Sequence, residues 1–173
     1  MEIFDLYDIN RKLTGETMIR GNDVPNGRYR MVVHVIVFNK EGKMLIQQRT
    51  KDRTSNPGKW DFSVGGCVVS GETSSIAAER ELYEELGLKV KLQNTLANFS
   101  ISFSTGFDDY YVIDYDIDEK DINYQKEEVQ AVRWADKQEI IELIQADKFI
   151  NYRISLVEFL FSFKQQRYGT YTK

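Results

Sequence analysis

The sequence predicts an α+β domain built on a mixed β-sheet, and three observations support this fold class. First, the run from Arg30 to Phe38 is almost continuously apolar and β-branched, which is typical of a central strand covered on both faces. Second, residues 73–86 carry apolar side chains at helical spacing. Third, the chain reads as strands, a helix, further strands and two final helices, an order that predicts helices on both sides of the sheet.

The chain begins with a predicted β-hairpin. Residues 2–20 hold two short strand-like segments on either side of a polar turn from Asn10 to Gly15. The loop that follows, residues 21–27, is dense in turn-forming residues. We expect residues 1–27 to extend a single domain, 1–173, whose core is 28–173. A chain of 173 residues with 42% hydrophobic and 13% aromatic content suits one compact core.

The strands of the core follow in order. After the strand at Arg30–Phe38, a turn containing Gly42 leads to a second strand, and the two form a hairpin. His34 lies inside the apolar run, where a lone histidine is more often a packed core residue than a ligand. The remaining strands are expected at Met44–Gln48, Trp60–Val64, within Lys89–Ser104 as one bent strand, at Phe107–Ile117 and at Val129–Ala135.

Two helices close the sequence. Asp136 is a good N-cap for a helix that ends at Gln145. The last helix is expected from Asn151 to about Arg167, and it carries too many apolar side chains for an exposed helix. It therefore covers the sheet or contacts a partner subunit, and a homodimer through this helix is the corresponding expectation.

Bulk composition narrows the class of protein. The net charge is −4, with acids and bases mixed along the chain, so no electrostatic footprint for duplex nucleic acid is expected. The single cysteine, Cys67, excludes an internal disulfide framework and fits a reducing compartment. No apolar run approaches the roughly 20 residues that span a bilayer, and the N-terminus is unlike a signal peptide. We expect a cytoplasmic protein with no membrane partner.

The helix predicted over residues 73–86 carries a cluster of carboxylates. With Glu81 taken as zero, Glu84 falls near 300° and Glu85 near 40°, at roughly 100° per residue. Such like-charge neighbours destabilise a helix, and a hard divalent cation held by oxygen ligands would offset that cost. The alternative is a solvated acidic face. We expect a buried stripe formed by Ile76, Leu82, Tyr83 and Leu86, with Ala77 and Ala78 in or beside the carboxylate arc.

The surrounding residues match a known signature. It reads Gly66, five residues, Glu72, seven residues, Arg80-Glu81-Leu82, one residue, Glu84-Glu85, one residue, Gly87-Leu88. In this stretch the chain resembles the Nudix hydrolases. The N-terminal pattern of Asp8, Arg11, Thr14 and Gly15 gives it a weaker resemblance to the isopentenyl-diphosphate-isomerase-like branch of that superfamily.

The resemblance implies a fold and a chemistry. The Nudix fold is an α/β/α sandwich with a mixed sheet, and its enzymes hydrolyse a diphosphate linked to another moiety. Mg²⁺, with Mn²⁺ as a substitute, would be bound by Glu81, Glu84 and Glu85 and by the backbone carbonyl of Gly65 or Gly66. Glu72 and Arg80 would pair and position these glutamates, and Gly87 would end the helix. The partner is a small-molecule diphosphate.

Further site residues are expected outside the helix. The resemblance places an acidic residue just before the strand that starts at Val129, and we favour Glu128 over Glu127 as metal ligand or general base. A base within the helix cluster is an open alternative. Arg49 and Arg53 are candidates for binding substrate phosphates, against the alternative of a solvated loop. The aromatic side chains Phe103, Phe107, Tyr110 and Tyr111 either stack on a nucleobase or belong to the core.

Three functions compete. The first is Mg²⁺-dependent hydrolysis of a nucleoside diphosphate-type or related substrate. The others are isopentenyl-diphosphate isomerisation and non-catalytic nucleotide binding. The isomerases carry a catalytic cysteine just before the glycine that opens the signature, and here Gly65 stands there, with Cys67 two residues on. The sequence therefore favours the hydrolase.

Overall fold

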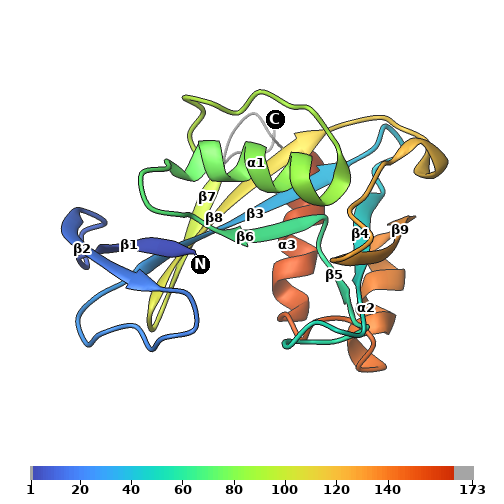
Figure 1. The fold of residues 1–173 in the computed structure, drawn as a ribbon. Helices are drawn as coiled ribbons and strands as arrows, with labels where there is room; N and C mark the ends of the chain where they lie inside the picture. Colours follow the sequence, from blue (N-terminus) through green and yellow to red (C-terminus); the bar gives the residue numbers. More distant parts are fainter. Residues whose placement is uncertain (1, 166–173) are drawn as a thin grey trace. The chain divides into compact units, whose positions relative to one another are not determined.

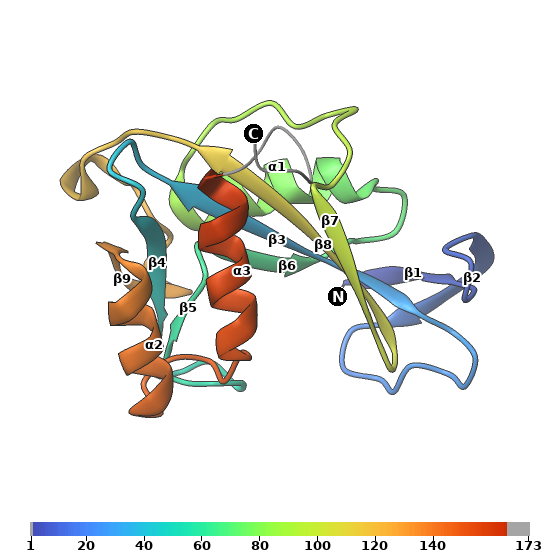
Figure 2. The ribbon, with the colours of Figure 1, turned by 180° about the vertical axis from the view of Figure 1, so that it is seen from behind.

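The computed structural model describes residues 2–165, which divide into two compact units. Of the described residues, the first unit contains 2–35, Gly65–Glu84 and Leu88–Tyr111, and the second contains Ile36–Val64, Glu85–Gly87 and 112–165. Strands β3 (Arg30–Phe38) and β8 (Gly106–Asp114) contribute residues to both units, as does helix α1 (Ser74–Leu86). Figures 1 and 2 show these elements from opposite sides.

The first unit opens with the predicted hairpin. Strands β1 (Ile3–Tyr7) and β2 (Leu13–Ile19) pair antiparallel as a separate two-stranded sheet (Figure 1). The Asp8 carboxylate shapes the turn, because its Oδ1 accepts from the backbone N–H of Asn10 at 2.8 Å and of Lys12 at 2.9 Å. Phe4, Leu6 and Met18 of this hairpin form a buried cluster. The predicted hairpin is confirmed.

The first unit also holds one part of the main sheet. Strand β7 (Phe99–Phe103) pairs antiparallel with β8, β8 neighbours β3, and β6 (Val64–Cys67) pairs with β3. The backbone N–H of Arg30 donates to the carbonyl of Thr105 over 3.0 Å. In the second unit the N–H of Tyr115 donates to the carbonyl of Phe38 over 2.9 Å. Both strands thus run in the same direction, and with antiparallel neighbours beside them the predicted mixed sheet is confirmed.

The second unit surrounds strand β4 (Met44–Arg49). This strand pairs antiparallel with the end of β3, with β5 (Trp60–Asp61) and with β9 (Val129–Ala135). A short 3₁₀ turn, η1 (Glu119–Asp121), precedes β9. The helices α2 (Lys137–Gln145) and α3 (Ile154–Gln165) pack against each other (Figure 2). Asp136 caps α2 as predicted, in a capping box with Glu139.

Three predicted strands were wrong in extent, and in the first two side chains replace backbone partners. The strand expected at Trp60–Val64 is interrupted, because the Ser63 hydroxyl accepts from the N–H of Val37 and donates to the carbonyl of Leu45. The bent strand expected in Lys89–Ser104 is limited to β7, because the Glu79 carboxylate accepts from the backbone of Leu92 and Gln93. Strand β8 also ends earlier than predicted, at Asp114.

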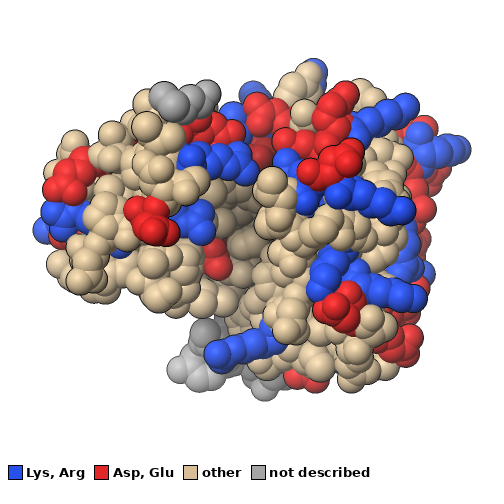
Figure 3. Space-filling view, turned by 60° about the horizontal axis from the view of Figure 1, so that its bottom comes forward, with Lys and Arg blue, Asp and Glu red and all other residues tan. Residues whose placement is uncertain are grey.

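The last helix begins at Ile154, and its predicted end at Arg167 lies outside the described residues. Val157 and Leu160 are fully buried, whereas Phe159 is exposed. Within residues 2–165, none of the helices has the length and apolar character needed to cross a membrane. On the face drawn in Figure 3, basic and acidic side chains are interspersed.

Candidate active site

The signature forms a turn followed by helix α1. Gly71 has a φ of +85° in that turn. Thr73 caps the helix, since its hydroxyl accepts from the N–H of Ile76 at 3.3 Å and its carbonyl accepts from Ala77 at 3.0 Å. At the other end Gly87 has a φ of +67°, and a Cβ there would lie 2.8 Å from the carbonyl oxygen of Asn123. Only glycine therefore fits this stop.

The buried face of α1 differs from the predicted one. Leu82 and Leu86 are buried as expected, but Ala77 and Ala78 are also fully buried, and Tyr83 is 53% exposed. Ile76 is half-buried. The buried stripe is thus rotated toward the carboxylates, because the two alanines are small enough to let the helix pack closely. The arc of glutamates lies at the edge of the packed face, and it does not lie opposite that face.

Helix α1 and strand β6 lie close together where Glu81 meets Gly66. A Cβ built on Gly66 would lie 2.1 Å from both Cδ and Oε1 of Glu81, so the missing side chain at Gly66 is the space that this carboxylate occupies. The Glu81 side chain is 15% exposed and that of Glu84 is 51% exposed. A carboxylate as buried as Glu81 needs strong polar partners.

Arg80 supplies those partners. Its Nε and Nη2 donate to the two oxygens of Glu72 at 2.8 and 3.0 Å, a bidentate pair. Its Nη1 donates to Glu81 Oε1 at 2.8 Å and to Glu84 Oε2 at 3.1 Å, and Nη2 also donates to the carbonyl of Cys67 at 3.2 Å. These bonds, led by the one to Glu72, raise the pKa of Arg80. Glu72 thus fixes Arg80, and Arg80 fixes two signature glutamates.

Glu85 has a different partner. In the second unit, Gln47 Nε2 donates to Glu85 Oε2 over 2.6 Å, and both residues are buried, with 3% and 5% exposure respectively. The carbonyl of Glu85 also accepts from the N–H of Gln125 at 2.9 Å. Gln47 lies on β4 and was not predicted as a site residue. A polar residue between Ile46 and Gln48 on a buried strand was the available signal.

The remaining predicted residues lie in the second unit. Arg53 Nη1 forms a 2.8 Å ion pair with Glu128 Oε2, so the arginine expected to bind phosphate is paired with the expected base. The Arg49 side chain bonds to the loop that follows it: Nε donates to the carbonyl of Ser55 and Nη2 to its hydroxyl, both over 3.1 Å. Arg49 Nη1 also lies 3.8 Å from Asp61 Oδ2. Arg49 therefore stabilises this loop in the structure.

The aromatic candidates pack in the first unit. Phe107, Tyr110 and Tyr111 are buried, at 3%, 1% and 2% exposure, which favours the core alternative for all three. Tyr110 stacks between Phe99, at 4.7 Å between ring centroids, and His34, at 4.8 Å. Burial lowers the pKa of His34 to about 4, so the ring is neutral near pH 7. His34 is thus a packed core residue, as expected.

Comparison with known proteins identifies the family. A family model described as NUDIX domain matches residues 28–156. The chain belongs to the Nudix family. The protein named "Uncharacterized Nudix hydrolase lmo0368" from Listeria monocytogenes is 46% identical over 152 residues, which are 88% of this chain and 90% of that protein. This Nudix chain is accordingly a hydrolase-family enzyme.

Two further comparisons extend the identification. The solved structure of DR0079 from Deinococcus radiodurans has a TM-score of 0.72 and 24% identity, covering 97% of this chain and 100% of that one. This likeness confirms the predicted Nudix α/β/α fold. The isopentenyl-diphosphate Delta-isomerase of Streptomyces coelicolor is 32% identical over 90 residues, which are 52% of this chain and 46% of that protein.

The Nudix helix presents oxygen donors that suit a hard divalent cation. Within the described part of the chain, no three acidic, histidine or cysteine side chains converge as a ready-made metal-binding group. In this structure Arg80 engages Glu81 and Glu84, while Gln47 engages Glu85. The donor set itself fits: carboxylate oxygens at one edge of a continuous helix, with the Glu81 carboxylate seated against Gly66.

Proposed function

We propose that this protein is a Mg²⁺-dependent hydrolase that cleaves a diphosphate linkage in a nucleoside diphosphate-type or related small molecule. Mn²⁺ would substitute for Mg²⁺. The observation that carries the proposal is the arrangement of signature side chains on α1 and in the turn before it. Glu72 anchors Arg80, Arg80 bonds to Glu81 and Glu84, and Glu81 lies beside Gly66. That arrangement keeps acidic side chains in place at the edge of a packed helix.

The proposed roles follow from these contacts. Glu81, Glu84 and Glu85 would hold the metal, with the Gly66 carbonyl beside them. When bound, the metal neutralises diphosphate charge and lowers the pKa of a bound water. Arg80 and Gln47 position the carboxylates. These hydrogen bonds hold the side chains of Glu81 and Glu85 in one conformation, although neighbouring carboxylates repel each other.

Glu128 is the proposed base that accepts the proton of the attacking water at a carboxylate oxygen. Its ion pair with Arg53 gives this assignment a physical basis, because a substrate phosphate would compete for the guanidinium and release the carboxylate. A base within the α1 cluster is the alternative. Substrate arrival and base activation would then be linked through one ion pair.

The decisive test is a substrate screen with and without metal. The panel contains nucleoside diphosphates, dinucleotide polyphosphates, nucleotide sugars and isopentenyl diphosphate. We expect hydrolysis with Mg²⁺ or Mn²⁺ only, and a loss of about 10³-fold in kcat when Glu84 and Glu85 are both changed to Gln. Full activity of that double variant, or full activity in excess chelator, would disprove the metal assignment.

Isomerase activity is the second candidate, since a relative with that name covers about half of the chain. The Cys67 thiol is the obvious proton carrier, but burial raises its pKa, so it is a poor base at neutral pH. Gly65 has no side chain to replace it. Incubation with isopentenyl diphosphate in deuterated water tests this candidate: deuterium in dimethylallyl diphosphate, lost in Cys67→Ala, would favour isomerisation.

Three further expectations belong to the proposal. The chain acts as a single domain, 1–173, with residues 1–27 as its hairpin extension. It is a cytoplasmic protein, consistent with its single cysteine. It forms a homodimer through α3, whose Phe159 is 45% exposed. Light scattering on the purified chain, with Phe159→Ser as the variant, tests the dimer.

A further inference from the structure

The turn inside the Nudix signature is held by a strand that lies outside the signature. Asp5 of β1 accepts two hydrogen bonds from this turn: Oδ1 accepts from the Ser70 hydroxyl over 2.6 Å, and Oδ2 accepts from the backbone N–H of Gly71 over 2.8 Å. The carbonyl of Ile3 accepts from the N–H of Ser70, also over 2.8 Å. The N-terminal hairpin thus bonds to two consecutive residues of the turn.

Hydrogen bonds matter at this turn because it has little packing to hold it. Ser70 and Gly71 are both exposed, and Gly71 has a positive φ of +85°. Fixing an exposed turn in one arrangement costs conformational entropy. A carboxylate that accepts from a hydroxyl and a backbone N–H offsets that cost, because charge-assisted hydrogen bonds are stronger than neutral ones. Asp5 is therefore well suited to fix this turn.

The turn leads directly to the side chains of the candidate metal site. Glu72 follows Gly71 in the chain, and its two carboxylate oxygens accept from Nε and Nη2 of Arg80 over 2.8 and 3.0 Å. Nη1 of Arg80 in turn donates to Glu81 and Glu84. A displaced turn would carry Glu72 with it, and the bidentate pair would pass the displacement on to Arg80. The positions of two signature glutamates thus depend on where the turn lies.

The hairpin is itself fixed to the signature strand through apolar contacts. Its inner face presents Phe4, Leu6 and Met18, which form a buried cluster. The partly buried side chains of Cys67 and Val69 pack against this cluster from within the signature. Strand β1 therefore contacts the signature through packing on one face and through hydrogen bonds at the turn.

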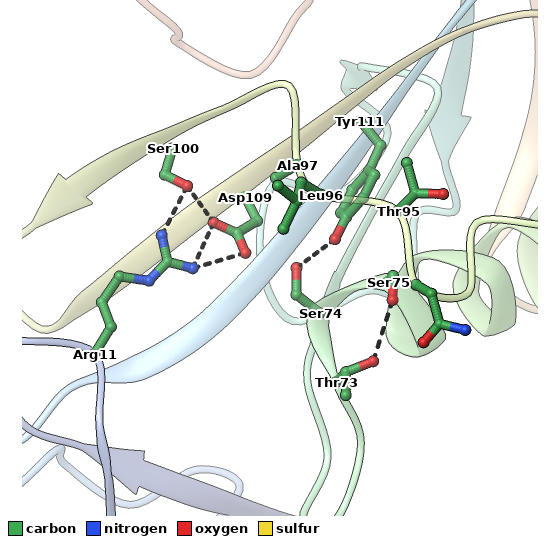
Figure 4. A pocket seen from close by; sticks show the side chains of 11 residues that line it. Arg11, Thr73, Ser74, Ser75, Thr95, Leu96, Ala97, Ser100, Asp109 and Tyr111 are labelled. Atoms are coloured by element: carbon green, nitrogen blue, oxygen red, sulfur yellow. Dashed lines mark hydrogen bonds and ion pairs between the residues drawn. The ribbon is translucent and has the colours of Figure 1, made fainter.

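The other end of the hairpin is fixed to the main sheet of the first unit. Arg11 Nη2 lies 2.8 Å from each carboxylate oxygen of Asp109, and Arg11 Nη1 donates to the Ser100 hydroxyl over 2.7 Å (Figure 4). Tyr7 and Tyr29 also exchange two backbone hydrogen bonds, over 2.8 and 3.0 Å. With this support, β1 is a rigid element from which Asp5 can hold the turn.

We propose that Asp5 is a positioning residue of the candidate metal site, and that the β1–β2 hairpin is an integral part of that site. Asp5 fixes the turn, the turn places Glu72, and Glu72 places Arg80, which bonds to two signature glutamates. The consequence for metal binding rests on the proposed function. The link from Asp5 to Arg80 stands without it.

The role of Asp5 in this proposal is geometric and does not depend on its charge. An asparagine at this position can keep both contacts, because its Oδ1 accepts from the N–H of Gly71 while its amide donates to the Ser70 oxygen. An alanine can keep neither. Asp5→Asn should therefore behave much like wild type, whereas Asp5→Ala should release the turn.

Glu16→Ala is the matched control for Asp5→Ala. Glu16 lies on β2 of the same hairpin, and its carboxylate also accepts two hydrogen bonds, both over 2.7 Å. Its donor is Arg28, which lies outside the signature. The control thus removes an equivalent carboxylate with two bonds from the hairpin and leaves the signature turn untouched.

The first measurement uses metal-free protein and no substrate. Hydrogen exchange followed by NMR should show the N–H of Gly71 exchanging roughly three- to tenfold faster in Asp5→Ala, the value of one hydrogen bond. The Nε–H resonance of Arg80, whose proton is donated to Glu72, should shift in the same variant. Asp5→Asn and Glu16→Ala should keep the wild-type values for both signals.

The second measurement is the Kd for Mn²⁺, determined by electron paramagnetic resonance well below the Tm of each variant. We expect Asp5→Ala to raise this Kd about tenfold, the lower end of the range for residues that orient metal ligands. Ser70→Ala removes one of the two bonds from the exposed turn itself, and it should change the Kd in the same direction by a smaller factor. This variant decides the question if Asp5→Ala does not fold.

The outcomes separate this inference from the proposed function. An Arg80 resonance and a Mn²⁺ Kd that both stay at wild-type values in Asp5→Ala and Ser70→Ala, with only the Tm lowered, would overturn the positioning role. Equal changes in Glu16→Ala, or damage from Asp5→Asn as large as from Asp5→Ala, would also overturn it. Failure of the wild type to bind Mn²⁺ would contradict the proposed function, and the Arg80 resonance would still decide whether Asp5 positions the signature.

Discussion

Replacing Gly66 with alanine tests the site through a single methyl group. The ideal Cβ at this position lies 2.1 Å from Glu81 Cδ and Oε1 and 2.5 Å from Cγ. Ordinary contact begins near 3.4 Å, so the carboxylate must move by about 1.3 Å. Gly66 does not have a positive φ, so the substitution itself adds no backbone strain.

The size of the effect follows from that displacement. Misplacing a catalytic group by about 1 Å can reduce activity by about 10²-fold, and we expect a loss of that order in kcat/KM for Gly66→Ala. Mn²⁺ affinity, measured by electron paramagnetic resonance on the folded protein, should fall as well. The obstructing atoms belong to a flexible side chain, so stability should fall by only about 1 kcal/mol, a shift of roughly 2–4 °C in Tm.

Gly65→Ala is the matched control. Its Cβ would lie 3.1 Å from Nδ1 of His34. The three atoms nearest to that Cβ belong to His34 and Val33, and none belongs to a signature glutamate. This variant should therefore show a similar loss of stability but retain metal affinity and turnover. If Gly66→Ala binds Mn²⁺ and turns over like wild type, the Glu81 carboxylate is not where the chemistry occurs. Equal damage from Gly65→Ala would also refute the reasoning.

Three further predictions address other parts of the site. Glu128→Gln should lower kcat by about 10²–10⁴-fold, whereas damage from the same change in the preceding glutamate alone would show that the wrong neighbour was chosen. Gln47→Met removes a buried donor to Glu85 and should lower the free energy of unfolding in urea by about 1.5–3 kcal/mol. The control Gln130→Met changes an exposed glutamine and should have little effect, so an equal loss of stability in both variants would contradict this prediction. Burial raises the pKa of Asp61 to about 6, above roughly 3.9 in the unfolded chain, so wild type loses stability as pH rises through that window. Asp61→Asn should therefore gain stability relative to wild type between those pH values, and a pH-independent difference in Tm would count against it.

The sequence by itself determined the elements whose signals are local. The apolar β-branched run at Arg30–Phe38 forms β3 with the expected bounds, and the Asp136 cap starts α2 where predicted. The spacing from Gly66 to Leu88 was sufficient to indicate the family, because fixed spacing on one loop and one helix needs no long-range information. These features depend on neighbours within a few residues.

The tertiary structure decided everything that depends on a distant partner. The predicted buried stripe of α1 was rotated because close packing of two alanines outweighed the hydrophobicity of Tyr83. Gln47 and Glu85 are 38 residues apart in sequence, and Arg11 and Asp109 are 98 apart. No periodicity links such pairs. The packing of strands and helices decides which carboxylate is buried and which donor bonds to it. A buried charge needs such a partner, and the partner is brought near only by folding.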